Sequence, residues 1–135
     1  MANFVLDKGF LALSTYNSSA VAGVLAYRFV KFGAGGTIDI QSASNAVNVG
    51  VVMEQADQAK VATGKATLNV RMIGIAKVIV GTGGVTQGAR VMSSTTGTAI
   101  TAATSGNFIA GIALQTGAVG DLIDVLLTPG GGLVP

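Results

Sequence analysis

Residues 111–127 constrain the fold of this 135-residue chain more than any other stretch. A polar, glycine-containing turn at 116–121 separates two short apolar runs, which is the pattern of a β-hairpin. In a strand, successive side chains point to opposite faces. The second run is therefore predicted to place Leu122, Asp124 and Leu126 on one face and Ile123, Val125 and Leu127 on the other.

A similar stretch begins at Gly50, and a shift of 61 residues aligns much of the two halves of the sequence. The aligned pairs include Val24 with Val85, Val30 with Val91, Gly36 with Gly97, Thr37 with Thr98, and Gly50 with Gly111. Farther on the first copy is longer by five residues, so Val70 is aligned with Leu126. We interpret this as duplication of one β-unit, with pseudo-repeats at about 20–72 and 81–127. The alternative is chance similarity between two hairpins.

The rest of the chain also predicts an all-β fold, a small β-sandwich or barrel built from two similar β-units. Strands are expected at 10–16, 30–32, 37–40, 48–53, 66–72 and 73–80, and residues 54–60 form either one helical turn or a wide loop. Residues 10–128 are predicted to form a single β domain, preceded by a flexible N-terminal arm at 1–9. Pro129 and three glycines predict a flexible C-terminal tail at 129–135.

Composition predicts a protein whose surface is covered by partners. Half of the residues are apolar and only 10% are charged, well below the usual quarter. The eight Lys and Arg residues are scattered, so we expect no nucleic-acid partner. No uninterrupted apolar stretch is long enough for a membrane span, so we expect no membrane partner.

No arrangement of residues in the sequence predicts catalysis, a metal site or a cofactor. There is no Cys and no His, so thiol and imidazole chemistry are excluded. Residues 81–88 are rich in glycine but lack the ending of a phosphate loop, and they are interpreted as a hairpin loop. Asp121 and Asp124 have an odd spacing, so they do not share one face of a strand. We therefore expect that the protein is not an enzyme.

Three stretches resemble a known family. They are residues 74–78 (Gly-Ile-Ala-Lys-Val), residues 85–92 (Val-Thr-Gln-Gly-Ala-Arg-Val-Met), and residues 111–115 (Gly-Ile-Ala-Leu-Gln) continuing through 120–127. Together they resemble the small capsid decoration, or cement, proteins of tailed phages. The likeness covers about 20–128 and is clearest over 73–128. This chain has Gln115 where members typically have an acidic residue, and Gly88-Ala89 where Gly-Asp is common.

The resemblance implies a β-rich virion protein, commonly a homotrimer, that is made in the host cytoplasm and binds the outer surface of the icosahedral head. There it would stabilise contacts between subunits of the major capsid protein. The capsid-binding arm of such proteins maps onto Met1, Ala2, Asn3, Phe4 and Val5. Contacts at the rim, with other copies or with the capsid, are assigned to Arg28, Lys31, Leu133 and Val134.

The alternative is another virion β-protein, a head-fibre or tail module that binds host surface glycans. Such a protein needs exposed aromatic side chains on which sugars stack. Tyr16, Tyr27 and Phe108 are the candidates for that role.

Overall fold

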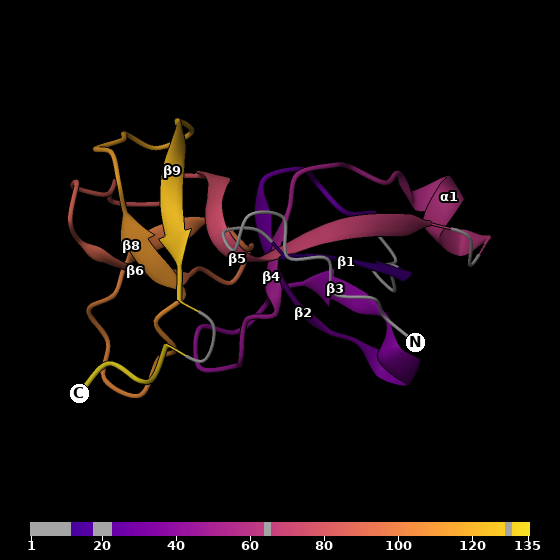
Figure 1. The fold of residues 1–135 in the computed structure, drawn as a ribbon, viewed down its shortest axis with the longest axis horizontal. Coiled ribbons are helices and arrows are strands. Elements are labelled where there is room, and N and C mark those ends of the chain that lie inside the picture. The colour runs from indigo at the N-terminus through magenta and orange to yellow at the C-terminus, as the bar shows by residue number, and fades with distance from the viewer. Residues whose placement is uncertain (1–11, 18–22, 64–65, 129–130) are drawn as a thin grey trace.

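The computed structural model describes residues 12–17, 23–63, 66–128 and 131–135, with backbone alone for 12–17 (Figure 1). In these ranges the chain forms nine strands, one short α-helix and one 3₁₀ turn. The predicted arm at 1–9, with all five of its proposed capsid-binding residues, lies outside them. The strands are β1 (Ala12–Asn17), β2 (Arg28–Phe32), β3 (Ile38–Ile40), β4 (Gly50–Val52), β5 (Thr67–Ile79), β6 (Arg90–Ser93), β7 (Ala99–Thr101), β8 (Gly111–Ala113) and β9 (Leu122–Leu127). The turn is η1 (Ala34–Gly36) and the helix is α1 (Gln58–Ala62).

The long strand β5 joins two β-units that lie side by side, as Figure 1 shows. The first unit contains β1 to β4 and residues 67–72 of β5, in the order β3-β2-β4-β5-β1. The second unit contains residues 73–79 of β5 and β6 to β9, in the order β7-β6-β8-β9-β5. A parallel bridge between Val80 and Ala99 links the two ends of the second order. The expectation of a small all-β fold is confirmed.

The two units have matching backbones at a shift of 61 residues. Val30 pairs with both Ile40 and Gly50, and Val91 pairs in the same way with Thr101 and Gly111. The turn glycines agree as well, because φ is 77° at Gly36 and 78° at Gly97. Strand pairing and turn conformation are therefore repeated, in addition to the amino-acid pattern.

The last strands of the two units align one residue away from the sequence-based alignment. Val51 pairs with Arg71, and its counterpart Ile112 pairs with Leu126. Leu126 therefore corresponds to Arg71, and Val70 corresponds to Val125 rather than to Leu126. Burial agrees, since Val70 and Val125 are fully buried while Leu126 is 40% exposed.

Each unit has its own hydrophobic core, made mostly of small β-branched and aliphatic side chains. In the first unit the core is Val24, Val30, Ile38, Val49, Val52, Ala56, Val61, Ala66, Leu68 and Val70. The second core contains the counterparts of many of these residues, including Val85, Val91, Ala99, Ala110, Ala113, Ile123 and Val125. Alternation along each strand turns these residues inward, so one pattern builds both cores.

Three local features differ from the sequence prediction or complete it. The strands expected at 66–72 and 73–80 are one strand, β5, which passes through Gly74 at a φ of 87°. Residues 58–62 form the helical alternative, α1, whose first turn is capped by the Asp57 carboxylate, 2.8 Å from the Lys60 nitrogen.

The C-terminal residues 131–135 were predicted to be a flexible tail, but they lie antiparallel to residues 106–109. The Ile109 N–H donates to Gly132 O at 2.9 Å, and the Val134 N–H donates to Asn107 O at 2.8 Å. Gly131 permits this approach, because a Cβ there would lie 2.7 Å from the Ile109 carbonyl oxygen. Gly131, one of the glycines that suggested flexibility, instead lets two backbones come close together.

Candidate binding surfaces

The junction between the two units buries the outward side of β2 and β4. Phe29 and Val51 belong to these strands, yet they pack into the core cluster of the second unit and are 1% and 0% exposed. The Phe29 N–H donates to Gly97 O at 2.8 Å. A Cβ on Gly97 would lie 2.9 Å from the Phe29 oxygen, so the β6–β7 turn fits against β2 only with glycine there.

The corresponding side of the second unit faces solvent. We call it the outer face and define it as Ile75, Lys77, Ile79, Ile112, Leu122, Asp124 and Leu126. Strand register places these residues together, because Ile79 pairs with Leu122, Lys77 with Asp124, and Ile75 with Leu126, which also pairs with Ile112. Ile75, Leu122 and Leu126 are 48%, 45% and 40% exposed. The second unit thus presents adjacent, partly exposed aliphatic side chains on a sheet surface that no other described residue covers, a feature typical of interaction sites.

One ion pair crosses the outer face. Lys77 Nζ lies 3.1 Å from Asp124 Oδ1, and the two side chains are 51% and 32% exposed. Exposed pairs of this kind contribute about 0–1 kcal/mol to stability. The seven residues of the face are therefore aliphatic around a single pair of opposite charges, and the exposed Arg90, which pairs with Ile112, borders them on β6.

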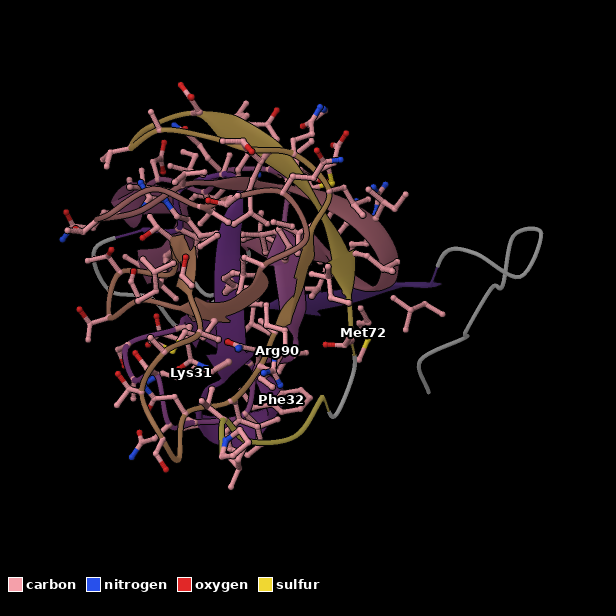
Figure 2. The ribbon with its side chains drawn as sticks, turned by 90° about the vertical axis from the view of Figure 1, so that its left-hand side faces the viewer. Lys31, Phe32, Met72 and Arg90 are labelled. Atoms are coloured by element: carbon pink, nitrogen blue, oxygen red, sulfur yellow. The ribbon has the colours of Figure 1, made fainter. Side chains whose placement is uncertain are left out.

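The structure places the predicted rim residues Arg28 and Lys31 on the same strand but in different settings. Arg28 Nη1 donates to the Thr96 carbonyl at 3.3 Å, so this side chain spans the junction between the units. Lys31 Nζ donates to the Ser42 hydroxyl at 2.5 Å within the first unit. Figure 2 shows Lys31, Phe32 and Arg90 from the side of the second unit.

The other two rim residues, Leu133 and Val134, lie in the C-terminal segment that pairs with residues 106–109. Leu133 is 53% exposed and Val134 is half-buried. They therefore lie on the second unit beside Phe108, whose N–H donates to the carbonyl of Ser44 in the first unit at 3.0 Å.

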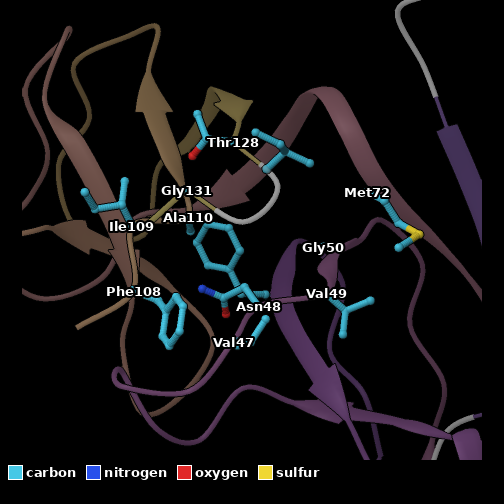
Figure 3. A pocket seen from close by; sticks show the side chains of 12 residues that line it. Val47, Asn48, Val49, Gly50, Met72, Phe108, Ile109, Ala110, Thr128 and Gly131 are labelled. Carbon is cyan, nitrogen blue, oxygen red and sulfur yellow. The ribbon is translucent and has the colours of Figure 1, made fainter. Parts of the chain in front are cut away.

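Two of the aromatic candidates for glycan binding, Phe108 and Tyr27, lie where the two units meet. Phe108 lines a small cavity between the units, together with Phe29, Asn48 and Met72 (Figure 3). The cavity has a volume of about 20 Å³, far below the ~300 Å³ of a small-molecule site. Tyr27 has a φ of 59° and its carbonyl accepts a hydrogen bond from the Ile79 N–H at 3.1 Å, so its backbone joins the two units. Of Tyr16 only the backbone is described.

The described carboxylates form hydrogen bonds with other residues of the chain. Asp121 accepts a hydrogen bond from the Ala118 N–H at 2.9 Å and closes the β8–β9 turn. Glu54 accepts from Asn69 Nδ2 at 2.7 Å. Within the described ranges no group of three acidic side chains is placed to hold a metal ion. No helix there is long and apolar enough to cross a membrane.

Sequence reasoning missed Gln41, a fully buried polar residue. Its Nε2 donates to Asn48 Oδ1 at 2.8 Å and to the Ala46 and Val47 carbonyls at 3.2 Å. These bonds hold the loop between β3 and β4, which carries the exposed Val47. Nothing in the local sequence distinguishes Gln41 from a solvated glutamine, because its burial depends on residues five to seven positions away.

The fold and its surfaces define an all-β protein of two similar units with an uncovered aliphatic sheet face. No protein-family model and no curated protein matches the sequence. Among solved structures, the chain is similar to the N base of head fiber gp8.5 of bacteriophage phi29, with a TM-score of 0.66. The sequence identity is 21%, and the match covers 86% of this chain and 94% of the phi29 chain. The two chains therefore share a fold over nearly their whole lengths.

Proposed function

We propose that this chain is a structural protein of a phage virion that binds the outer surface of the head and contacts the major capsid protein. The observation that carries the proposal is the match to the base of a phage head fibre, which spans almost all of both chains. The sequence stretches at 74–78, 85–92 and 111–127, which resemble capsid decoration proteins, support the same placement independently of the fold.

The surface chemistry is consistent with a role in assembly. The outer face is aliphatic, and only 10% of the chain is charged. Interfaces that are weak one at a time hold firmly when they are repeated over a shell, because binding at one site raises the effective concentration at the next. Head stabilisation needs no reacting group. It therefore requires no catalytic role for the carboxylates, which form hydrogen bonds with other residues of the chain.

Within this class we propose the decoration role, in which the protein itself stabilises the head. Proteins that stack sugars need exposed aromatic rings, and Phe108 lines the cavity between the units. The match to a fibre base favours the second candidate, a module at the foot of a fibre. The two candidates share attachment to the head and differ in whether attachment alone raises head stability.

The test uses heads from a phage in which this gene is deleted. Purified protein is mixed with expanded heads, the heads are sedimented, and the temperature of head disruption is recorded. We expect saturable co-sedimentation and a higher disruption temperature. Binding without a change in disruption temperature would favour the fibre base, and absence of binding would refute head attachment.

Variants of the N-terminal arm test whether the arm contacts the head. Deletion of residues 1–5, or Phe4→Asp, is expected to abolish co-sedimentation while the far-ultraviolet circular dichroism stays unchanged. The control is Val119→Lys, at a 65% exposed position in the β8–β9 turn, which is expected to bind normally. Equal binding by the deletion variant and the control would refute the assignment of the arm. A glycan array with Phe108→Ala as comparison tests sugar binding separately.

A further inference from the structure

The outer face alternates aliphatic and charged rows along its two central strands, β5 and β9. On each strand one charged residue lies between two aliphatic ones. In register, the order is Ile75, Lys77, Ile79 on β5 and Leu126, Asp124, Leu122 on β9. The middle row is therefore a Lys–Asp pair, and the row at either end is wholly aliphatic.

The same side of the first unit is already a packing surface. Val51 on β4 is fully buried where the second unit packs against it. Its counterpart Ile112 belongs to the outer face and is only half-buried, and Leu126 beside it is exposed. One β-unit thus has this side covered within the chain, while the other presents it to solvent.

The charged row makes the outer face complementary to a second copy of itself. A twofold axis that runs along the strands, midway between β5 and β9, places β5 of one copy over β9 of the other. Lys77 of each copy then faces Asp124 of the other, and Ile75 faces Leu126. A twofold axis across the strands would instead place Lys77 over Lys77 and Asp124 over Asp124. Opposite charges favour the first arrangement and like charges disfavour the second.

Packing in this arrangement keeps every charge of the face paired. Lys77 Nζ already lies 3.1 Å from Asp124 Oδ1 in its own copy, and the second copy adds another opposite charge beside each group. The resulting ring of four alternating charges offsets the cost of removing them from water. Arg90 stays at the rim, because β8 separates β6 from β9.

We propose that the outer face binds the outer face of a second copy, around a twofold axis parallel to β5 and β9. The two sheets pack face to face with aligned strands, as in a β-sandwich, and the aliphatic rows of one copy cover those of the other. The face has seven residues, fewer than the roughly 20–30 a side of a standard interface. The dimer is therefore weak in solution and forms at micromolar concentrations.

The test uses the purified full-length chain and does not depend on head binding. Sedimentation velocity from about 1 to 100 µM is expected to show association toward twice the 13.3 kDa chain mass. Lys77→Glu makes the charged row wholly acidic and Asp124→Lys makes it wholly basic, so each variant is expected to dimerise at least about tenfold more weakly. The matched control is Lys60→Glu, an equal change of charge on the exposed side of α1, at the opposite end of the molecule from β9 (Figure 1). It is expected to dimerise like the wild-type chain.

Mixing the two single variants tests whether the charges act between copies. The acidic row of Lys77→Glu faces the basic row of Asp124→Lys in a mixed dimer, so the mixture is expected to associate at least as strongly as the wild-type chain. A wild-type monomer at every concentration, an assembly that Lys77→Glu leaves unchanged, or a mixture that stays monomeric would overturn the proposal. Circular dichroism checks folding. The double variant Lys77→Asp, Asp124→Lys keeps one charge of each sign on every copy and is expected to dimerise like the wild-type chain.

Discussion

Two alanine substitutions at equivalent turn positions measure the junction between the units. Gly97 and Gly36 have φ values of 78° and 77°, so Ala meets the same backbone penalty at both. They differ in what a new Cβ would touch. At Gly97 it would lie 2.9 Å from the Phe29 oxygen and 3.1 Å from Ile40 Cγ2, whereas at Gly36 it meets nothing within 4 Å.

The expected magnitudes follow from these two terms. Placing Ala at a positive φ costs about 1 kcal/mol at either site. Overlap with a backbone oxygen that cannot rotate away adds about 1–3 kcal/mol at position 97. Gly97→Ala should therefore lower the free energy of unfolding by about 2–4 kcal/mol and Gly36→Ala by about 1 kcal/mol, a difference of several degrees in Tm.

Urea denaturation measures the loss of stability in both variants, at a protein concentration low enough that the chains do not associate. The two m-values should match that of the wild-type chain, so that the midpoints report stability alone. Equal losses at the two positions would refute the reasoning, because they would mean that the β6–β7 turn does not pack against β2 in solution.

Three further substitutions test the cores and the surfaces, each by the same denaturation measurement. Val125→Ala should lower the free energy of unfolding by about 2 kcal/mol, because it opens a cavity in a fully buried site. Leu126→Ala, measured on the monomeric chain, should change it by less than about 0.5 kcal/mol. The reverse order would contradict the one-residue correction to the repeat alignment. Gln41→Ala should cost about 1–3 kcal/mol, since it removes a fully buried side chain and leaves part-buried carbonyl groups unpaired, and a neutral result would mean that the loop it holds is not ordered by this amide. A double-mutant cycle on Lys77 and Asp124 should give a coupling below about 1 kcal/mol that falls with added salt, whereas a larger, salt-insensitive coupling would mean that the pair is not exposed.

The strand and turn layout could be predicted from the sequence because the signals are local. Glycines at matching turn positions and apolar residues at alternate positions locate the hairpins without knowledge of the rest of the fold. The prediction that Leu122, Asp124 and Leu126 share a face is confirmed, since Ile123, Val125 and Leu127 are buried. The alignment of Val70 was wrong by one residue because the first copy is longer by six residues rather than five, and a loop's length does not fix where the next strand pairs.

The candidate surfaces could not be predicted in the same way, because their exposure depends on contacts between distant segments. Ile112 and Val51 have similar side chains at equivalent positions, yet Val51 is buried and Ile112 is partly exposed only because the second unit packs on the first. The role of Gly131 was also hidden, since a glycine that permits close backbone approach and one in a flexible tail look the same in sequence.

Electron cryomicroscopy of the virion tests the central proposal most directly, by comparing heads from the wild-type phage with heads from a phage that lacks this gene. The account predicts density on the outer surface of the wild-type head into which the two β-units fit, and its loss in the deletion. Unchanged density on the head surface, or density for this chain at the tail, would contradict it.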